Sequence, residues 1–223
     1  MTSLQQAVLR TLSYADIFDY PMTRDEIYRF LIGRKTSPKQ IDEAVFPLFP
    51  QYVGCSNDLF FLRNREQIAL LRRSRELYAG PKRAIAQAFA RLAIRFPPVL
   101  CVGITGALSM NNTHKEDDID LFVITRRNRL WTARLFLTAL AEVLYQRRSP
   151  GDVVVGNKLC LNMFLDEEAL MMSQKNLYIA HEVYQMKPLA VKEETYDRFL
   201  QANKWASRFL PNWIPIEKSW SNT

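Results

Sequence analysis

The most informative hydrophobic pattern lies between residues 99 and 124, where two strand-like stretches flank a polar spacer. The first stretch, residues 99–104, is almost wholly apolar and is followed by Gly106. The second stretch carries Asp118 and Asp120 at its start. Because strand side chains alternate between two faces, both carboxylates project from one face while the intervening apolar residues fill the other. The pattern predicts two buried strands that bring an acidic pair to a turn.

The first 63 residues combine helical periodicity with a short hairpin pattern. Apolar residues at helical spacing and N-capping sequences predict three helices, over residues 3–18, from Thr23 to about Gly33, and from Ser37 onward. Two apolar runs, residues 52–55 and 59–62, flank the polar Ser56-Asn57-Asp58 and predict a hairpin. Three short helices followed by a hairpin resemble a winged helix.

The remaining periodicity predicts further helices and strands around the central pair. We expect two helices separated at Gly80-Pro81, then helices over residues 130–145, 167–185 and 193–209 and strands over residues 153–155 and 159–165. The predicted fold class is α/β in the α+β sense, a mixed sheet with flanking helices preceded by a small winged-helix-like domain. We divide the chain into a winged-helix-like module (1–63), a basic helical connector (64–95) and an α/β domain with C-terminal helices (96–223).

Composition narrows the class of protein. The chain has 223 residues, 48% of them hydrophobic, enough to bury a sizeable core. No apolar run approaches the roughly 18 residues that a membrane span needs, and the first residues lack a signal peptide's apolar centre, so we expect a cytoplasmic protein without a membrane partner. The three cysteines lack metal-site spacing and are interpreted as reduced apolar fillers.

Positive charge is concentrated in the middle of the chain. Residues 64–100 hold eight Lys or Arg and two Glu, whereas residues 1–63 hold seven basic and seven acidic side chains. A neutral module with Asp42 and Glu43 on its third helix is a poor duplex binder, because DNA affinity comes mostly from phosphate neutralisation. DNA binding is therefore disfavoured. The basic segment is either a solvated helix face or a surface for a triphosphate or polyanionic acceptor.

Asp118 and Asp120 are the main candidates for chemistry. Two carboxylates side by side at the start of an apolar strand repel one another unless a cation lies between them, and hard oxygen ligands suit Mg²⁺. A bare Asp-x-Asp also fits a solvated strand entrance. A dinucleotide-binding interpretation of Gly103 to Gly106 fails, because that fingerprint needs three glycines before a helix and an acidic residue about 20 positions later.

The full arrangement resembles the nucleotidyltransferase superfamily, the polymerase-β-like fold. Its signature is an apolar residue, Gly, then Gly or Ser, a spacer, and Asp-x-Asp or Asp-x-Glu on the next strand. Gly106-Ala107 stands at the first position and Asp118-Ile119-Asp120 at the second. Ala107 departs from the pattern because it offers no hydroxyl to a phosphate. Thr105, Ser109 or backbone N–H groups would have to take over that role.

The resemblance also implies a reaction and its ligands. Family members commonly carry a third carboxylate on a neighbouring strand, which puts Asn162 at or near that position as a neutral substitute. The implied activity is transfer of a nucleoside monophosphate from an NTP, with ATP the expected donor, to an unidentified small molecule, protein or RNA. Mg²⁺ or Mn²⁺ would be held by Asp118 and Asp120. Asn162 and Ala107 favour the alternative, a non-catalytic nucleotide-binding or DNA-binding regulator on the same fold.

Overall fold

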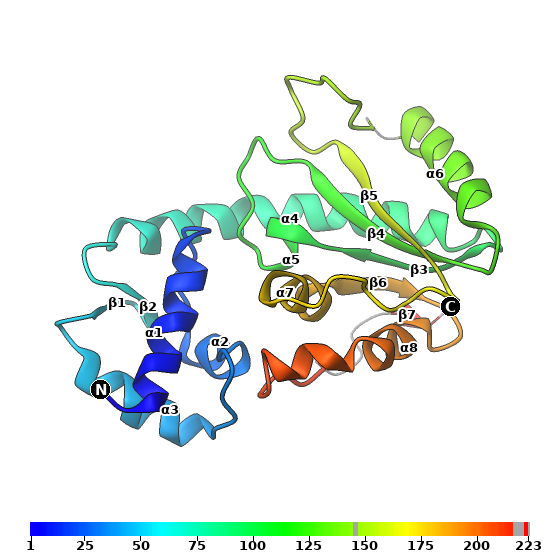
Figure 1. Ribbon diagram of the computed structural model, residues 1–223. Helices are drawn as coiled ribbons and strands as arrows, with labels where there is room; N and C mark the ends of the chain where they lie inside the picture. Colours follow the sequence, from blue (N-terminus) through cyan, green and yellow to red (C-terminus); the bar gives the residue numbers. More distant parts are fainter. Residues whose placement is uncertain (145–146, 216–220, 223) are drawn as a thin grey trace. The chain divides into compact units, whose positions relative to one another are not determined.

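A computed structural model describes residues 1–144, 147–215 and 221–222 (Figure 1). The chain divides into two compact units. The first comprises Met1–Ser74, Lys175–His181 and Trp205–Pro215, and the second is built mainly from Arg75–Gln174 and Glu182–Lys204. The first boundary therefore falls inside a helix, after Ser74. The predicted three-part division at residues 63 and 95 stays a prediction.

The N-terminal part of the first unit contains the predicted elements. In chain order they are α1 (Ser3–Asp16), α2 (Arg24–Arg29), α3 (Pro38–Val45), the 3₁₀ turn η1 (Phe46–Leu48), β1 (Val53–Ser56) and β2 (Leu59–Leu62). Each of the three α-helices starts with a capping box, whose N-cap residues are Thr2, Thr23 and Ser37. Thr2 caps α1, which begins at Ser3.

The β1–β2 hairpin closes on a two-residue loop. The strands pair antiparallel up to Ser56 and Leu59. Asn57 and Asp58 between them have φ angles of 51° and 60°. Asn and Asp tolerate this left-handed conformation better than most residues, and its twist matches that of the flanking strands. The predicted hairpin is confirmed.

The second unit is built on a mixed sheet with strand order β5-β4-β3-β6-β7. Its strands are β3 (Val99–Ile104), β4 (Ile119–Thr125), β5 (Leu159–Asp166), β6 (Lys187–Val191) and β7 (Ser221–Asn222). β3 pairs antiparallel with β4 and β6, whereas β4–β5 and β6–β7 are parallel. The other elements that lie wholly in this unit are α5 (Gly106–Ser109), α6 (Leu130–Leu144) and α8 (Thr195–Ala202). The predicted α/β fold class is confirmed.

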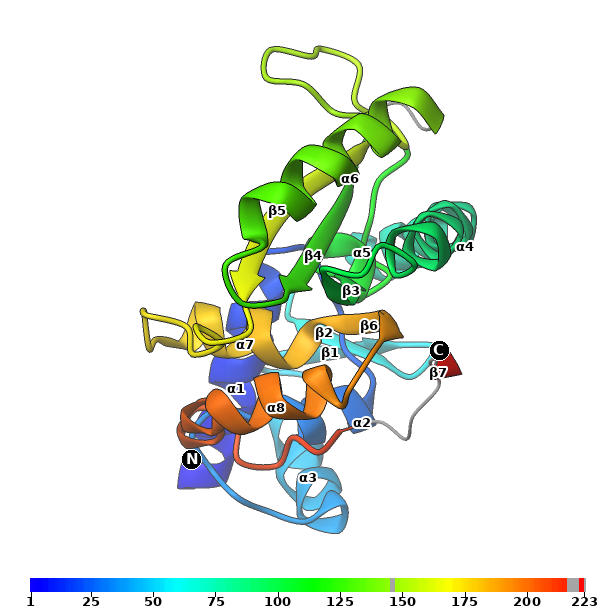
Figure 2. The ribbon, with the colours of Figure 1, turned by 90° about the vertical axis from the view of Figure 1, so that its right-hand side faces the viewer.

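The two faces of this sheet are covered by different helices (Figure 2). Leu121 and Val123 of β4 pack in a core with Phe89 of α4 (Gln67–Ala93) and Leu137 of α6. Phe122 points to the opposite face, where its ring lies 5.1 Å from that of Phe199 in α8. The alternation predicted for this strand therefore separates an α4–α6 face from an α8 face, and Asp120 belongs to the latter.

The predicted break at Gly80-Pro81 is wrong, because α4 runs through Pro81 as one helix. Proline removes one backbone N–H and leaves the carbonyl four residues earlier, at Leu77, without its helical partner. Leu77 is 77% exposed, so water can satisfy that carbonyl. Ala79 and Lys82, on either side of the proline, are both buried within the second unit.

The C-terminal half differs from expectation in three places. Residues 153–155 form no strand, and Val153 is 96% exposed. Helix α7 (Leu177–Gln185) begins ten residues later than expected, and α8 is followed by the 3₁₀ turn η2 (Lys204–Arg208) instead of extending to residue 209. The predicted helix end at residue 145 lies outside the described residues.

Strand β6 lies between α7 and α8 and contains Pro188. Proline lacks a ladder donor, and within sheets it is confined to edges and bulges. Here the β3–β6 register shifts between Val102 and Gly103, next to the pairing of Gly103 with Pro188. This irregularity accommodates the proline inside the sheet.

Among the described helices, none combines the length and apolar character needed to cross a bilayer.

Candidate functional site

A tight turn after β3 brings the backbone against Asp120. The N–H of Thr105 donates to the carbonyl of Asp120 over 3.1 Å. Gly106 follows with φ +60°, and a Cβ at this position would lie 2.8 Å from Oδ2 of Asp120. Glycine is needed here both for the left-handed conformation and for the close approach to the carboxylate.

The spacer before β4 is fixed by hydrogen bonds. Oδ2 of Asp117 accepts from the N–H of His114 over 2.7 Å and from the hydroxyl of Thr113 over 3.2 Å. Lys82, only 1% exposed, donates from Nζ to the carbonyls of Lys115 and Asp117. Hydrogen bonds within the spacer and from Lys82 of helix α4 therefore fix the segment that leads into Asp118.

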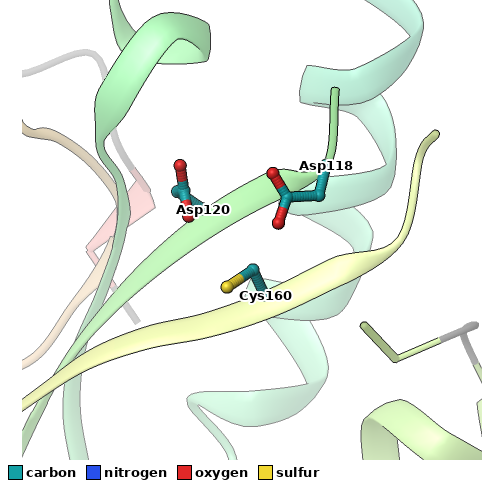
Figure 3. A group of neighbouring side chains, drawn as sticks. All are labelled: Asp118, Asp120 and Cys160. Carbon is teal, nitrogen blue, oxygen red and sulfur yellow. The ribbon is translucent and has the colours of Figure 1, made fainter. Parts of the chain in front are cut away.

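Asp118, Asp120 and Cys160 form a group with metal-ligand geometry (Figure 3). One potential ligand atom from each residue lies within 4.8 Å of the other two. Asp118 and Asp120 project from the start of β4, and the parallel register places Cys160 of β5 opposite Asp120. The group can offer two hard carboxylate oxygens and one soft sulfur to a cation.

Without a cation, the group is electrostatically unfavourable. Burial raises the pKa of Asp120, and the charge of Asp118 raises it further. Burial and the two carboxylates raise the pKa of the Cys160 thiol to about 11. The compensating charge on Asp118 comes from Arg148, whose Nη1 lies 2.6 Å from Oδ2 of Asp118. A divalent cation between the carboxylates would relieve their repulsion more directly.

The residues predicted to replace the missing hydroxyl have different environments. Ala107 is exposed. Ser109 is fully buried, and its hydroxyl donates to the carbonyl of Gly106 over 2.8 Å, so it stabilises the turn. Thr105 is 6% exposed, and its Oγ1 has no hydrogen-bond partner among the described residues. Of these two hydroxyls, that of Thr105 is therefore the one that makes no hydrogen bond with the described residues.

Asn162 lies in an irregular part of β5. The register shifts between the Asp120–Cys160 pair and the Phe122–Met163 pair, and Asn162 is exposed within this shift. Strict alternation relative to β4 therefore does not hold across this part of β5. The residue opposite Asp120 is Cys160, and a binding role for Asn162 stays a prediction.

Three residues of the site region were missed from the sequence. Cys160 was interpreted as an apolar filler, although its thiol hydrogen-bonds with Asp120. Arg148 lies in a segment without periodicity. Burial raises the pKa of Glu182 in α7, and the charge of the nearby Asp120 raises it further. The sequence does carry one signal for Cys160. It is a polarisable residue at the start of a predicted strand that could pair with the strand of the Asp pair.

The basic middle segment is partly structural. Arg72, 8% exposed, donates to Glu26 within the first unit, with Nη1 2.7 Å from Oε2. Arg75, 3% exposed, donates to Oδ1 of Asn112 over 2.9 Å in the second unit. The exposed guanidinium groups of the segment within the second unit are those of Arg83, Arg91 and Arg95.

No family model matches the chain, and no curated protein matches its sequence. A solved structure, the crystal structure of a toxin-antitoxin with AMP-PNP, aligns with 54% of this chain and 84% of its own at 21% identity, with a TM-score of 0.34. At this level of similarity, the alignment carries no argument about function.

Proposed function

We propose that this protein is a Mg²⁺-dependent nucleotidyltransferase, which moves a nucleoside monophosphate from an NTP to a hydroxyl or similar acceptor. The observation that carries the proposal is the convergence of Asp118 and Asp120 on one side of β4, next to a glycine turn that a side chain would block. This combination of a carboxylate pair and an open backbone turn suits a metal-bound polyphosphate.

Asp118 and Asp120 would hold the metal ion, for which Mn²⁺ is an alternative. The bound cation supplies charge neutralisation on the phosphates. Gly106 allows the backbone N–H groups of the turn to approach the phosphates, and the unpartnered Thr105 hydroxyl offers a further donor. In the reaction, the acceptor oxygen bonds to the α-phosphorus, the bond to the bridging oxygen breaks, pyrophosphate leaves, and the acceptor proton is released.

Cys160 supports a second candidate, a nucleotide-binding protein without transferase activity. The resemblance to nucleotidyltransferases implies a third carboxylate beside the Asp pair, and a carboxylate can accept a proton from the acceptor hydroxyl. A thiol with a pKa of about 11 is protonated at neutral pH and cannot accept one. Turnover of NTP with pooled acceptors separates the two candidates.

The metal site can be tested through nucleotide binding. Asp118→Asn and Asp120→Asn each remove one carboxylate while keeping its shape, and we expect both to abolish Mg²⁺-dependent NTP binding measured by calorimetry. The melting temperature of Asp120→Asn without Mg²⁺ should not fall, because the substitution relieves like-charge repulsion. Asp118→Asn relieves the same repulsion but also loses the half-exposed ion pair with Arg148, so its melting temperature should change little.

Glu116→Gln is the matched control, since Glu116 is an exposed acid in the spacer beside the site. It removes the same charge and should leave NTP affinity unchanged. Equal NTP affinity in wild type and in both Asp variants with Mg²⁺ present would exclude the assigned site.

A further inference from the structure

The ligand set beside β4 is of mixed chemical hardness. Carboxylates are hard ligands that suit Mg²⁺, whereas a cysteine sulfur is a soft ligand that Mg²⁺ does not favour and that Zn²⁺ and Co²⁺ accept readily. An all-oxygen site would need a third oxygen ligand where this chain has Cys160.

The geometry permits all three side chains to bind a single ion. Two bonds of about 2.0 Å to oxygen and about 2.3 Å to sulfur span at most about 4.3 Å across one metal ion. The ligand atoms of Asp118, Asp120 and Cys160 already lie within 4.8 Å of one another. Small rotations of the side chains therefore suffice. Cys160 is half-buried on a paired strand, so its sulfur is held beside the carboxylates.

Thr105 gives independent support for a ligand at this position. Ile104 pairs with Leu121, and the N–H of Thr105 donates to the carbonyl of Asp120, so Thr105 and Asp120 are opposite one another on adjacent strands and share a face. Its Oγ1 is buried and has no partner within the part of the chain that the structure describes. Buried hydroxyls are normally hydrogen-bonded, so this oxygen points to a ligand or metal-bound water on the same face.

We propose that Cys160 is a direct metal ligand, and that together with Asp118 and Asp120 it gives the site a preference for a thiophilic divalent cation of the Zn²⁺ class over Mg²⁺. This inference rests on the proposed metal site, and it replaces the Mg²⁺ of the proposed function by a cation of the Zn²⁺ class while leaving the proposed transfer reaction unchanged. On binding, the thiol proton is released to solvent and the metal–sulfur bond forms with the resulting thiolate. Metal binding to Asp118 breaks its ion pair with Arg148. The Arg148 side chain can move away because it is 46% exposed.

Co²⁺ is the probe, because a cobalt–thiolate bond gives a charge-transfer absorption that oxygen ligands do not. Titration of the full chain with Co²⁺ should produce this band, and excess Zn²⁺ should remove it. Cys160→Ser should abolish the band. Cys55→Ser should retain it, because Cys55 is the exposed cysteine in the hairpin of the first unit.

Metal selectivity gives a second measurement. Cys160→Asp replaces sulfur by oxygen ligands. We expect its Zn²⁺ affinity to fall by about tenfold or more, since losing even an outer-shell partner of a ligand costs about that much, while its Mg²⁺ affinity rises. In the unmodified protein, Zn²⁺ should also slow alkylation of Cys160, mapped by mass spectrometry, more than Mg²⁺ does. That measurement needs no variant and covers the case in which a substitution at Cys160 prevents folding.

The outcomes separate this inference from the proposed function. If Co²⁺ gives no thiolate band, or if Cys160→Ser keeps it, sulfur ligation is wrong. If sulfur ligation is wrong but Asp120→Asn still weakens metal binding, the proposed carboxylate metal site stands and Cys160 is not one of its ligands. If Asp118→Asn, Asp120→Asn and Cys160→Ser all leave metal binding unchanged, the inference and the proposed metal site both fail.

Discussion

At the scale of single residues, His181 shows how burial changes the chemistry of a side chain. Its ring stacks against Tyr14 at 4.2 Å between centroids and lies 5.6 Å from the ring of Phe30, all within the first unit. The side chain is 4% exposed, and burial lowers its pKa to about 4. His181 is thus a neutral core residue of the first unit.

His181 should make the protein less stable in mild acid. Its pKa is lower in the folded state than in the unfolded state, near 6.5, so the unfolded chain takes up the proton first. The stabilisation is fully present above about pH 6.5 and is lost as the pH falls toward 4, by about 3 kcal/mol at most. Denaturant unfolding at several pH values measures this. The free energy of unfolding of His181→Phe should fall less than that of the wild type between pH 6.5 and pH 4.

His114, the second of the two histidines, is exposed and provides the control. His114→Gln should follow the pH dependence of the wild type. Identical slopes for wild type and His181→Phe between pH 6.5 and 4 would contradict a buried neutral His181.

The candidate site was predictable where its residues are close in sequence. The glycine turn, the spacer and the Asp pair are local, and the alternation along one strand puts Asp118 and Asp120 on the same side. Cys160 is brought in by strand pairing, and a single shift in register changes which β5 residue lies opposite Asp120. No local pattern fixes that register, so Asn162 was placed beside the Asp pair from the family resemblance and from its polarity within the strand.

At the scale of elements, α4 fixes the segment that leads into the site. Lys82 is almost fully buried, and burial lowers its pKa, while Asp117 and Asp118 act in the opposite direction. Its ammonium group donates to two spacer carbonyls, at Lys115 and Asp117. One side chain of α4 therefore satisfies backbone groups that the spacer cannot pair itself.

Lys82→Met should destabilise the second unit. Methionine fills a similar volume but leaves the carbonyl of Lys115 without its donor, a loss of roughly 1–3 kcal/mol, whereas the carbonyl of Asp117 keeps the N–H of Asn157. We expect a lower denaturation midpoint and weaker Mg²⁺-dependent NTP binding, because the spacer positions Asp118. Arg83→Met is the matched control on the exposed neighbouring position of the same helix. Equal midpoints for the two variants would show that Lys82 is not needed to hold the spacer.

Elements were predictable from sequence where local signals agree, and not where tertiary contacts decide. The hairpin and the helix caps of the first unit follow from polar residues with specific backbone preferences. The exposed valines of residues 153–155 have strand propensity but form no strand. Pro81 and Pro188 are local breakers, yet packing around Lys82 and a register shift in the sheet keep α4 and β6 intact.

At the scale of the whole molecule, the net charge of +7 is unevenly distributed along the chain. On α3, Lys39 lies beside the exposed acids Asp42 and Glu43, and Asp42 forms an ion pair with Arg24 at 3.0 Å. In the second unit, the exposed Arg91 and Arg95 have no acidic residue next to them in sequence. Any polyanion should therefore be attracted to the end of α4 and the residues just after it, and not to α3.

This distribution predicts only weak, sequence-independent DNA binding. The full chain should bind duplex DNA with a Kd of about 10⁻⁴–10⁻⁶ M near physiological salt, the range of non-specific binding. Arg91→Ala with Arg95→Ala should weaken this binding and reduce its salt dependence, whereas Lys39→Ala should change neither, because the acids of α3 repel phosphate. Fluorescence anisotropy over a salt series measures both quantities. Nanomolar binding to a preferred sequence that Lys39→Ala removes would instead assign DNA recognition to α3 and favour the regulator over the transferase.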